Sequence, residues 1–161
     1  MAILALVIFV SDQLTKLIVL NYLSQTDEKI VLDGFFKFVH WGNTGAAWSM
    51  FHDRNGLLAG ISFIALIALF IFRRRFEPQK TLGWISLGLI FGGISGNLLD
   101  RVRVGHVVDF LRFYVNRRDG GEMGFPAFNV ADSAICIGVG LLFLLSFRNE
   151  QAAPVADESK V

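Results

Sequence analysis

The sequence contains a single cysteine, Cys136, which excludes an internal disulfide and a multi-cysteine metal site. Because Cys136 lies in an apolar run, we expect it to be a buried small hydrophobic residue. The three histidines are isolated and lack HExxH spacing, which argues against a metal ion. There is also no G-x-S-x-G nucleophile elbow and no phosphate-binding GK[ST] loop. We therefore expect no metal and no cofactor.

Charge is scarce as well. Charged residues make up 18% of the 161 residues, and the formal net charge is +1. The basic residues are scattered along the chain, so nothing indicates a nucleic-acid partner. Hydrophobic residues make up 53% and are collected in long runs, which is the composition of a membrane protein.

Four apolar runs are long enough to cross a membrane as helices. The first has no positively charged start and no small-residue cleavage site, so we expect a retained helix and not a removable signal peptide. The predicted spans cover residues 1–23, 55–72, 81–99 and 129–147. The predicted fold is an all-α membrane protein with one domain over residues 1–150 and a disordered polar tail over 151–161.

The connector between the first two spans has the pattern of a β-hairpin. Two short runs, KIVL and FFKFVHW, flank Asp33-Gly34, which is typical of a two-residue hairpin turn. A sheet exposed to lipid would leave backbone groups unpaired, so this hairpin must lie at the membrane surface. The string NTGAAWSMF follows, and either close backbone approach or an ordinary stop before the next helix explains its small residues.

The connector between the last two spans also predicts structure. Residues 106–115 are rich in β-branched and aromatic residues, which favours a strand with Asp109, Leu111 and Phe113 on one face. Residues 117–124 are polar and glycine-rich, so we expect a mobile surface loop there. Asn129 is positioned to cap the fourth helix, and Asp132 lies in its favourable first turn.

The order of the spans predicts the topology. Both structured connectors must emerge on one side, opposite the loop that carries Arg73, Arg74, Arg75 and Lys80 and turns at Pro78. These charges adjoin two helix ends, so we place that loop in the cytoplasm. Both termini are then cytoplasmic, and the small sheet lies at the extracytoplasmic surface.

Polar residues interrupt two of the spans. Asn97, Asp100 and Arg101 follow a helical spacing that places them on one face, and Gly88, Gly92 and Gly96 favour close approach of a neighbouring helix. Asp12 and Lys16 are four residues apart and able to pair. That pair is either a plain intramembrane ion pair or part of a functional site.

Two carboxylates, Asp109 and Asp132, lie in apolar settings near the membrane surface. If they are held close, both cannot ionise, so one keeps a proton while the other acts as a base. Such a pair activates water against a peptide carbonyl and protonates the leaving amine. The alternative is that Asp132 is an ordinary helix-start residue and that Asp109 pairs with Arg101 or Arg112.

Four strings occur in order: DQLTK from Asp12, NTGAAWS from Asn43, GNLLDRVRVGHVVDF from Gly96 and FNVADS from Phe128. Together they resemble the lipoprotein signal peptidase family, also called signal peptidase II. The resemblance covers about residues 3–147. It implies an aspartyl endopeptidase that cuts prolipoproteins just before the diacylglyceryl-modified cysteine. The implied catalytic residues are Asp109 and Asp132, and the implied substrate-binding residues are Asp12, Lys16, Asn43, Asn97, Asp100, Arg101 and Asn129.

The resemblance also implies a setting: the bacterial cytoplasmic (inner) membrane, with membrane lipid as a partner. We expect the protein to act as a monomer. The hairpin and the glycine-rich loop would cover the lipid-modified cysteine. Two departures, Trp48 in place of phenylalanine and a long segment over residues 116–125, bear on substrate preference. One competing hypothesis is a small transporter or proton conductor, with a relay through Asp12, Lys16, Asp100 and Asp109. Another is a scaffold that uses the glycine face of residues 88–96 for helix contacts.

Overall fold

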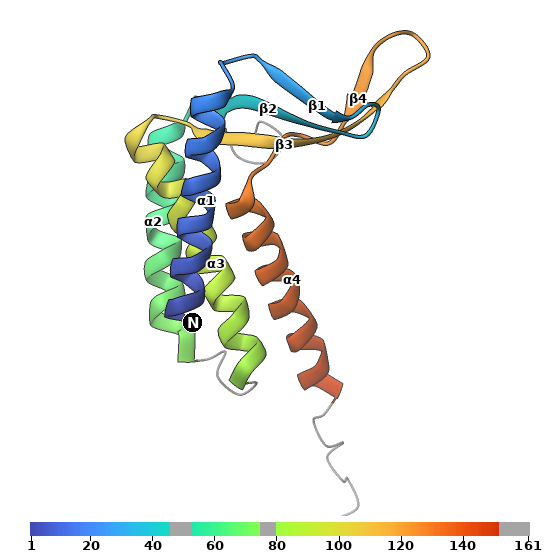
Figure 1. The fold of residues 1–161 in the computed structure, drawn as a ribbon. Helices are drawn as coiled ribbons and strands as arrows, with labels where there is room; N and C mark the ends of the chain where they lie inside the picture. Colours follow the sequence, from blue (N-terminus) through green and yellow to red (C-terminus); the bar gives the residue numbers. More distant parts are fainter. Residues whose placement is uncertain (46–52, 75–79, 152–161) are drawn as a thin grey trace, which may run out of the picture.

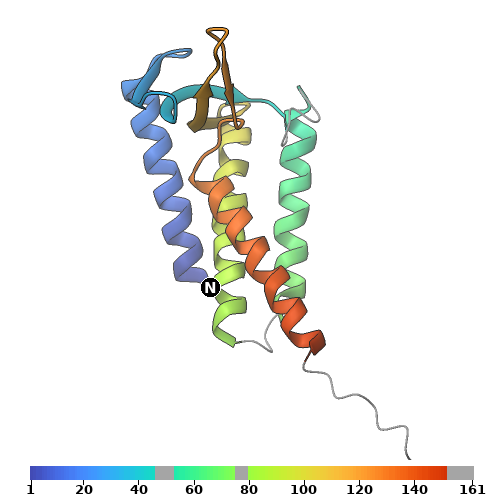
Figure 2. The same ribbon diagram turned by 90° about the vertical axis from the view of Figure 1, so that its right-hand side faces the viewer.

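The computed structural model describes residues 1–45, 53–74 and 80–151. It contains four long helices that stand side by side (Figures 1 and 2). Each is long and apolar enough to cross a membrane, which confirms the four predicted spans. The helices are α1 (Ala2–Tyr22), α2 (Asn55–Phe72), α3 (Lys80–Arg103) and α4 (Val130–Gln151). The third is longer than predicted, because the helix continues through the polar residues that follow Leu99.

Helix α3 is the centre of the bundle and contacts each of the other three helices. Its glycines permit the close approach of α1, as predicted. A Cβ added at Gly92 would lie 2.6 Å from the Ala5 carbonyl oxygen, and one added at Gly88 would lie 3.0 Å from the Met1 carbonyl oxygen. A larger residue at either position would push α1 away.

The outer faces of the helices expose large apolar side chains. On α2, Phe63 and Ile64 are 58% and 66% exposed, and on α4 Phe143 is 63% exposed. Exposure of this extent is costly in water and favourable in hydrocarbon. The bundle therefore presents a lipid-facing surface.

A four-stranded antiparallel sheet in the order β1-β2-β3-β4 lies across one end of the bundle (Figure 1). Its strands are β1 (Glu28–Leu32), β2 (Phe36–Asn43), β3 (Val107–Asn116) and β4 (Glu122–Gly124). The predicted hairpin is present, but its connection has three residues, because Leu32 pairs with Phe36. Gly34, with φ +68°, supplies the left-handed backbone that this turn requires.

Two local predictions are wrong. The segment over residues 117–124 is not simply a surface loop, because Glu122–Gly124 pairs with Tyr114, Val115 and Asn116 and makes a second hairpin. Cys136 is exposed and not buried, because it lies on the side of α4 that lines the cavity beneath the sheet. The predictions for residues 46–51, the turn at Pro78 and the tail beyond Gln151 fall outside the described residues.

The two ends of the bundle differ in content. The sheet, the end of α3 and the start of α4 lie together at one end, whereas the start of α1 and the end of α4 lie at the other (Figures 1 and 2). The prediction that Asn43, Asp109 and the start of the fourth helix share one side of the bundle is confirmed.

Candidate active site

A cavity of about 640 Å³ opens beneath the sheet. Its walls come from β2, the end of α3, β3, the segment that follows β4 and the first turns of α4. The polar residues that line it are Asn43, Thr44, Asn97, Arg101, Asp109, Asp132 and Ser133. Both carboxylates that the sequence singles out therefore face one cavity.

Strand β3 places Asp109 in this cavity, and the residue is only 3% exposed. Two amide groups hold the carboxyl group from opposite sides. Asn43 Nδ2 donates to Oδ2 at 2.9 Å, and Asn129 Nδ2 donates to Oδ1 at 2.8 Å. Among the contacts of the described residues, Arg112 pairs with Glu122 and Arg101 donates to the Gly45 carbonyl oxygen, and neither forms an ion pair with Asp109. The charge of Arg101 still acts on Asp109 from nearby.

The first turn of α4 places Asp132 in the same cavity as Asp109. Its Oδ1 accepts a hydrogen bond from Asn97 Nδ2 at 2.7 Å. Its Oδ2 accepts one from the backbone N–H of Asn129 at 3.2 Å, while its own backbone N–H donates to Asn129 Oδ1 at 2.8 Å. Asn129 therefore caps α4 as predicted, and it also contacts both carboxylates, that of Asp109 through its side-chain amide and that of Asp132 through its backbone N–H.

The pKa of Asp109 is raised to about 7, first by burial and second by the nearby charge of Asp132. The hydrogen bonds from Asn43 and Asn129 oppose this effect without cancelling it. A carboxyl group with a pKa near neutrality exchanges its proton at the pH of the cell surface. The pair is therefore able to hold one proton between its two members.

A buried ion cluster lies behind the cavity. Lys16 on α1 is 2% exposed, and its Nζ lies 2.8 Å from Asp12 Oδ2 and 2.7 Å from Asp100 Oδ2. The same ammonium donates to Asn97 Oδ1 at 2.9 Å, and so orients the amide that holds Asp132. The predicted pair of Asp12 and Lys16 is confirmed, and it is part of a larger network and not an isolated ion pair.

The carboxylate of Asp12 also acts on α4. Its Oδ1 accepts a hydrogen bond from the backbone N–H of Ala131 at 3.0 Å, which satisfies one of the free donors of the α4 N-terminus. Asp100 does the same for β3, because its Oδ2 accepts from the Val108 N–H at 3.2 Å. The cluster thus fixes both elements that carry the candidate carboxylates.

Gln13 belongs to this cluster, although sequence reasoning assigned it no role. Its Nε2 donates to Asp100 Oδ1 at 3.0 Å and to the Gly96 carbonyl oxygen at 3.2 Å. Its position beside Asp12, to which it also donates at 3.2 Å, was the available signal, because its two other partners are more than 80 residues away.

The predicted site residues divide into two groups. Asn43, Asn97 and Arg101 line the cavity together with the two carboxylates, whereas Asp12, Lys16, Asp100 and Asn129 lie behind its wall. Arg101 donates from Nη2 to the Gly45 carbonyl oxygen at 3.0 Å, and its Nε is buried without a hydrogen-bond partner among the described residues.

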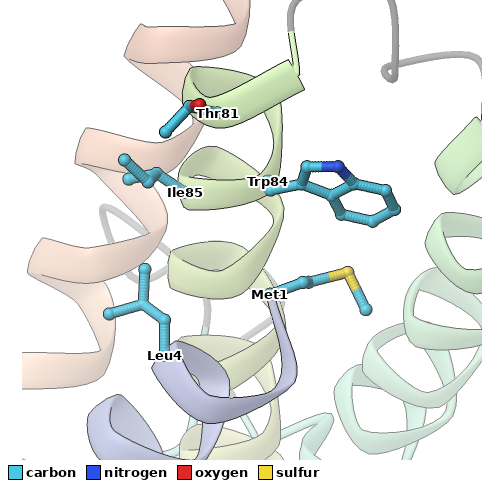
Figure 3. A pocket seen from close by; sticks show the side chains of 5 residues that line it. All are labelled: Met1, Leu4, Thr81, Trp84 and Ile85. Atoms are coloured by element: carbon cyan, nitrogen blue, oxygen red, sulfur yellow. The ribbon is translucent and has the colours of Figure 1, made fainter.

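A second cavity, of about 570 Å³, lies at the opposite end of the bundle (Figure 3). It is lined by Met1, Leu4, Thr81, Trp84 and Ile85. None of these side chains ionises, so the lining of this cavity offers no pair of carboxyl groups. The cavity beneath the sheet is the candidate active site.

The fold and the site define a multi-pass membrane protein in which two carboxyl groups face one cavity at the end of a four-helix bundle. Comparison with known families identifies the class. The chain belongs to the signal peptidase II family, whose model, described as "Signal peptidase (SPase) II", matches residues 4–148. The family resemblance predicted from the four strings is confirmed.

Relatives and solved structures agree with this assignment. The lipoprotein signal peptidase of Geobacter metallireducens is 40% identical over 153 residues, which cover 93% of this chain and 91% of the relative. That of Symbiobacterium thermophilum is 38% identical over 142 residues, with 88% and 90% covered. A solved bacterial membrane enzyme superposes with a TM-score of 0.81 at 30% identity, over 98% of this chain and 93% of that chain. A second superposes at 0.75 and 31%, over 91% of each.

Proposed function

We propose that Asp109 and Asp132 are the catalytic pair of this lipoprotein signal peptidase, an aspartyl peptidase that cleaves the signal peptides of prolipoproteins. The observation that carries the proposal is the bridge made by Asn129 behind the cavity wall: its side-chain Nδ2 donates to the Asp109 carboxylate, and its backbone N–H donates to the Asp132 carboxylate. Such a bridge holds the two groups at a fixed separation. It also leaves a face of each carboxyl group open to the cavity.

The proposed reaction uses one ionised and one protonated carboxyl group. The ionised group removes a proton from a water molecule, and the water oxygen attacks the carbonyl carbon of the scissile peptide. The protonated group donates first a hydrogen bond to the developing oxyanion and then its proton to the leaving nitrogen as the C–N bond breaks. Because the two titrations are coupled, the proton belongs to the pair and is not assigned to one aspartate.

The cavity-lining polar residues would position the substrate. Asn43 and Asn97 each hold one carboxylate, and Arg101 presents the free part of its guanidinium group to the same cavity. We propose that Asn43, Asn97 and Arg101 contact the peptide or the polar part of its lipid. The buried residues Asp12, Lys16, Asp100 and Asn129 would act through these contacts as positioning residues.

We further propose that the bond that is cut precedes a cysteine carrying diacylglycerol. The sheet overhangs α4 at the end of the bundle (Figure 1). Phe125 and Phe128, in the segment between β4 and α4, line the cavity together with both carboxylates. A lipid-modified residue presented from the bilayer would reach the carboxylates beneath this apolar cover. The exclusion of water there also favours the protonated state of a carboxyl group.

The proposed setting is the bacterial cytoplasmic (inner) membrane, with the sheet on the extracytoplasmic side and both termini in the cytoplasm. The support is the position of Arg73 and Arg74, which follow α2 at the end of the bundle that lies opposite the sheet. A single chain supplies all the polar partners described for the two carboxylates, which is consistent with a monomer.

The transporter hypothesis has less support. Helix α2 carries no charged residue from Asn55 to Phe72, and the buried charges of the helices form one hydrogen-bonded cluster beside the cavity. A relay across the membrane requires polar groups at every depth.

A cleavage assay tests the proposed substrate. Purified protein is incubated with a prolipoprotein that carries diacylglyceryl-cysteine, and with the same polypeptide unmodified. We expect mass spectrometry to find cleavage just before the cysteine, at least tenfold faster for the modified form, and unaffected by a chelator. Equal rates for both forms would exclude a lipid requirement, and loss of activity on chelation would contradict the metal-free mechanism.

A further inference from the structure

The sheet contains a buried cation that the proposed reaction does not use. Lys37 on β2 is 1% exposed and lies between two carboxylates, Glu28 on β1 and Glu122 on β4. Burial lowers the pKa of Lys37, but the two carboxylates outweigh that effect and hold the pKa above its usual value. The ammonium is therefore charged, and it also lies 4.6 Å from the centre of the Tyr114 ring.

The two carboxylates lie on opposite sides of the lysine. Strand β1 is the immediate neighbour of β2, whereas β4 is separated from β2 by β3. Glu122 reaches over β3, and both of its carboxyl oxygens lie 2.8 Å from Lys37 Nζ. This bidentate contact joins the β3–β4 hairpin, which projects from the end of the bundle, to a strand that β4 does not pair with (Figure 1).

Glu122 has a second contact that Glu28 lacks among the ion pairs of the described residues. Its Oε2 lies 3.5 Å from Nη2 of Arg112, and the guanidinium carbon of Arg112 lies 4.5 Å from the centre of the Trp41 ring. Arg112 Nε is buried without a hydrogen-bond partner in the described chain. The orientation of Arg112 thus depends on Glu122 and on the stack with Trp41.

Both ends of this chain of contacts adjoin the candidate active site. Trp41 lines the cavity and lies directly opposite Asp109 in the register of β2 and β3. On the other side, Glu122 is three residues before Phe125, where the segment that forms the cavity wall begins, and the Phe125 N–H donates to the Phe113 carbonyl oxygen at 2.9 Å. A shift of the hairpin would therefore move two parts of the wall together.

We propose that Glu122 is a positioning residue for substrate binding, which sets the cavity wall from outside by holding the β3–β4 hairpin through Lys37 and the Trp41 ring through Arg112. This inference rests on the proposed function, because it assigns the wall beside the two carboxylates to the lipid-modified part of the substrate. Glu122 does not line the cavity, so it acts on binding and not on the chemical step.

The two carboxylates that contact Lys37 provide a matched pair of variants. Glu122→Gln and Glu28→Gln each remove one carboxylate charge from the same ammonium, but only the first removes the contact with Arg112. In steady-state cleavage of the lipid-modified prolipoprotein, we expect Glu122→Gln to raise KM about five- to tenfold, a modest effect because the side chain of Glu122 is 33% exposed. We expect kcat and the pH profile to stay at wild-type values, since Asp109 and Asp132 are untouched. Glu28→Gln should leave both KM and kcat within about twofold of wild type.

Arg112→Lys gives an independent test in case Glu122→Gln does not fold. Lysine keeps the charge beside Glu122 but loses the flat stack on Trp41, so KM should rise while kcat is kept. Arg117→Lys is its control, because Arg117 lies on the same hairpin, is 57% exposed and pairs with Asp119. An equal rise of KM in Glu28→Gln, no rise in Glu122→Gln or Arg112→Lys, or a loss confined to kcat would overturn the proposal. A wild-type protein that does not cleave the substrate would instead refute the proposed function.

Discussion

Two buried lysines in the described part of the chain, Lys16 and Lys37, have partners of the same kind but different surroundings. Lys16 and Lys37 are 2% and 1% exposed, and each lies between two carboxylates. The carboxylates of Lys16 are 0% and 7% exposed, whereas those of Lys37 are 48% and 33% exposed. The first cluster is closed inside the bundle, and the second has one side in contact with solvent.

This difference decides what each cluster contributes. Inside the bundle, a charge that loses its partner has no water to replace it, so every member of the Lys16 cluster depends on the others. At the sheet, water screens the carboxylates and offsets part of any loss. We infer that the Lys16 cluster is required for the active site to form, whereas the Lys37 cluster adjusts the shape of the cavity wall.

The largest expected difference comes from removing the two cations. Lys16→Met leaves Asp12 and Asp100 buried without their counter-charge, and we expect a loss of about 3–5 kcal/mol in the free energy of unfolding. Lys37→Met leaves two partly exposed carboxylates, and the expected loss is about 1 kcal/mol or less. Unfolding in mixed detergent micelles measures both. Similar losses for the two variants would show that the exposure of the partners does not matter.

A smaller difference is expected when one carboxylate is removed from each cluster. Asp12→Asn keeps an acceptor for the Ala131 N–H but removes a charge from Lys16, and the expected loss is about 2 kcal/mol. We also expect weakened cleavage, because Lys16 orients the Asn97 amide that holds Asp132. Glu28→Gln serves as the control at the sheet, with a loss of less than about 0.5 kcal/mol. The same unfolding measurement compares the free energies of unfolding of the two variants. A larger loss of stability in Glu28→Gln than in Asp12→Asn would contradict the claim that the Lys16 cluster contributes more to stability.

The pH dependence separates catalysis from both lysine clusters. The pKa of Asp109 is raised to about 7, so its proton is present below that pH and is lost above it. Because the reaction needs one proton on the pair, we expect kcat to fall as pH rises through about 7, by up to about tenfold per pH unit. The folded state also binds more protons than the unfolded state between pH 3.8 and about 7, so the free energy of unfolding decreases modestly as the pH rises through that range. A pH–rate profile that stays flat from pH 6 to 9 would contradict a catalytic role for this proton.

Local signals in the sequence predicted the parts of the fold that depend on neighbours along the chain. The bounds of α2 follow from an uninterrupted apolar run. The Asn129 cap is also local, because Asn129 accepts from the backbone N–H of Asp132, only three residues later. Similar signals were insufficient where an element's partner is distant. The short strand β4 exists because it pairs with β3, and nothing in its own polar, glycine-rich sequence favours a strand.

The candidate site shows the same limit. Asp109 was expected to pair with Arg101 or Arg112 if it was not catalytic, because those arginines are near in sequence. On a strand, Asp109 and Arg112 are three residues apart and point to opposite faces, so Arg112 joins Glu122 instead. The partner of Asp109 is Asn43, which is 66 residues away, and only the pairing of β2 with β3 brings them together. Residue identities were predictable, but the hydrogen bonds that hold them were not.

The central claim is that Asp109 and Asp132 act as one catalytic unit, and single-turnover cleavage by Asp109→Asn and Asp132→Asn tests it most directly. With substrate binding and folding verified for each variant, we expect either substitution to slow cleavage by about 10²- to 10⁴-fold, and the double variant to be no slower than the slower single one. Cleavage near the wild-type rate in either variant, with cutting still just before the lipid-modified cysteine, would contradict the account.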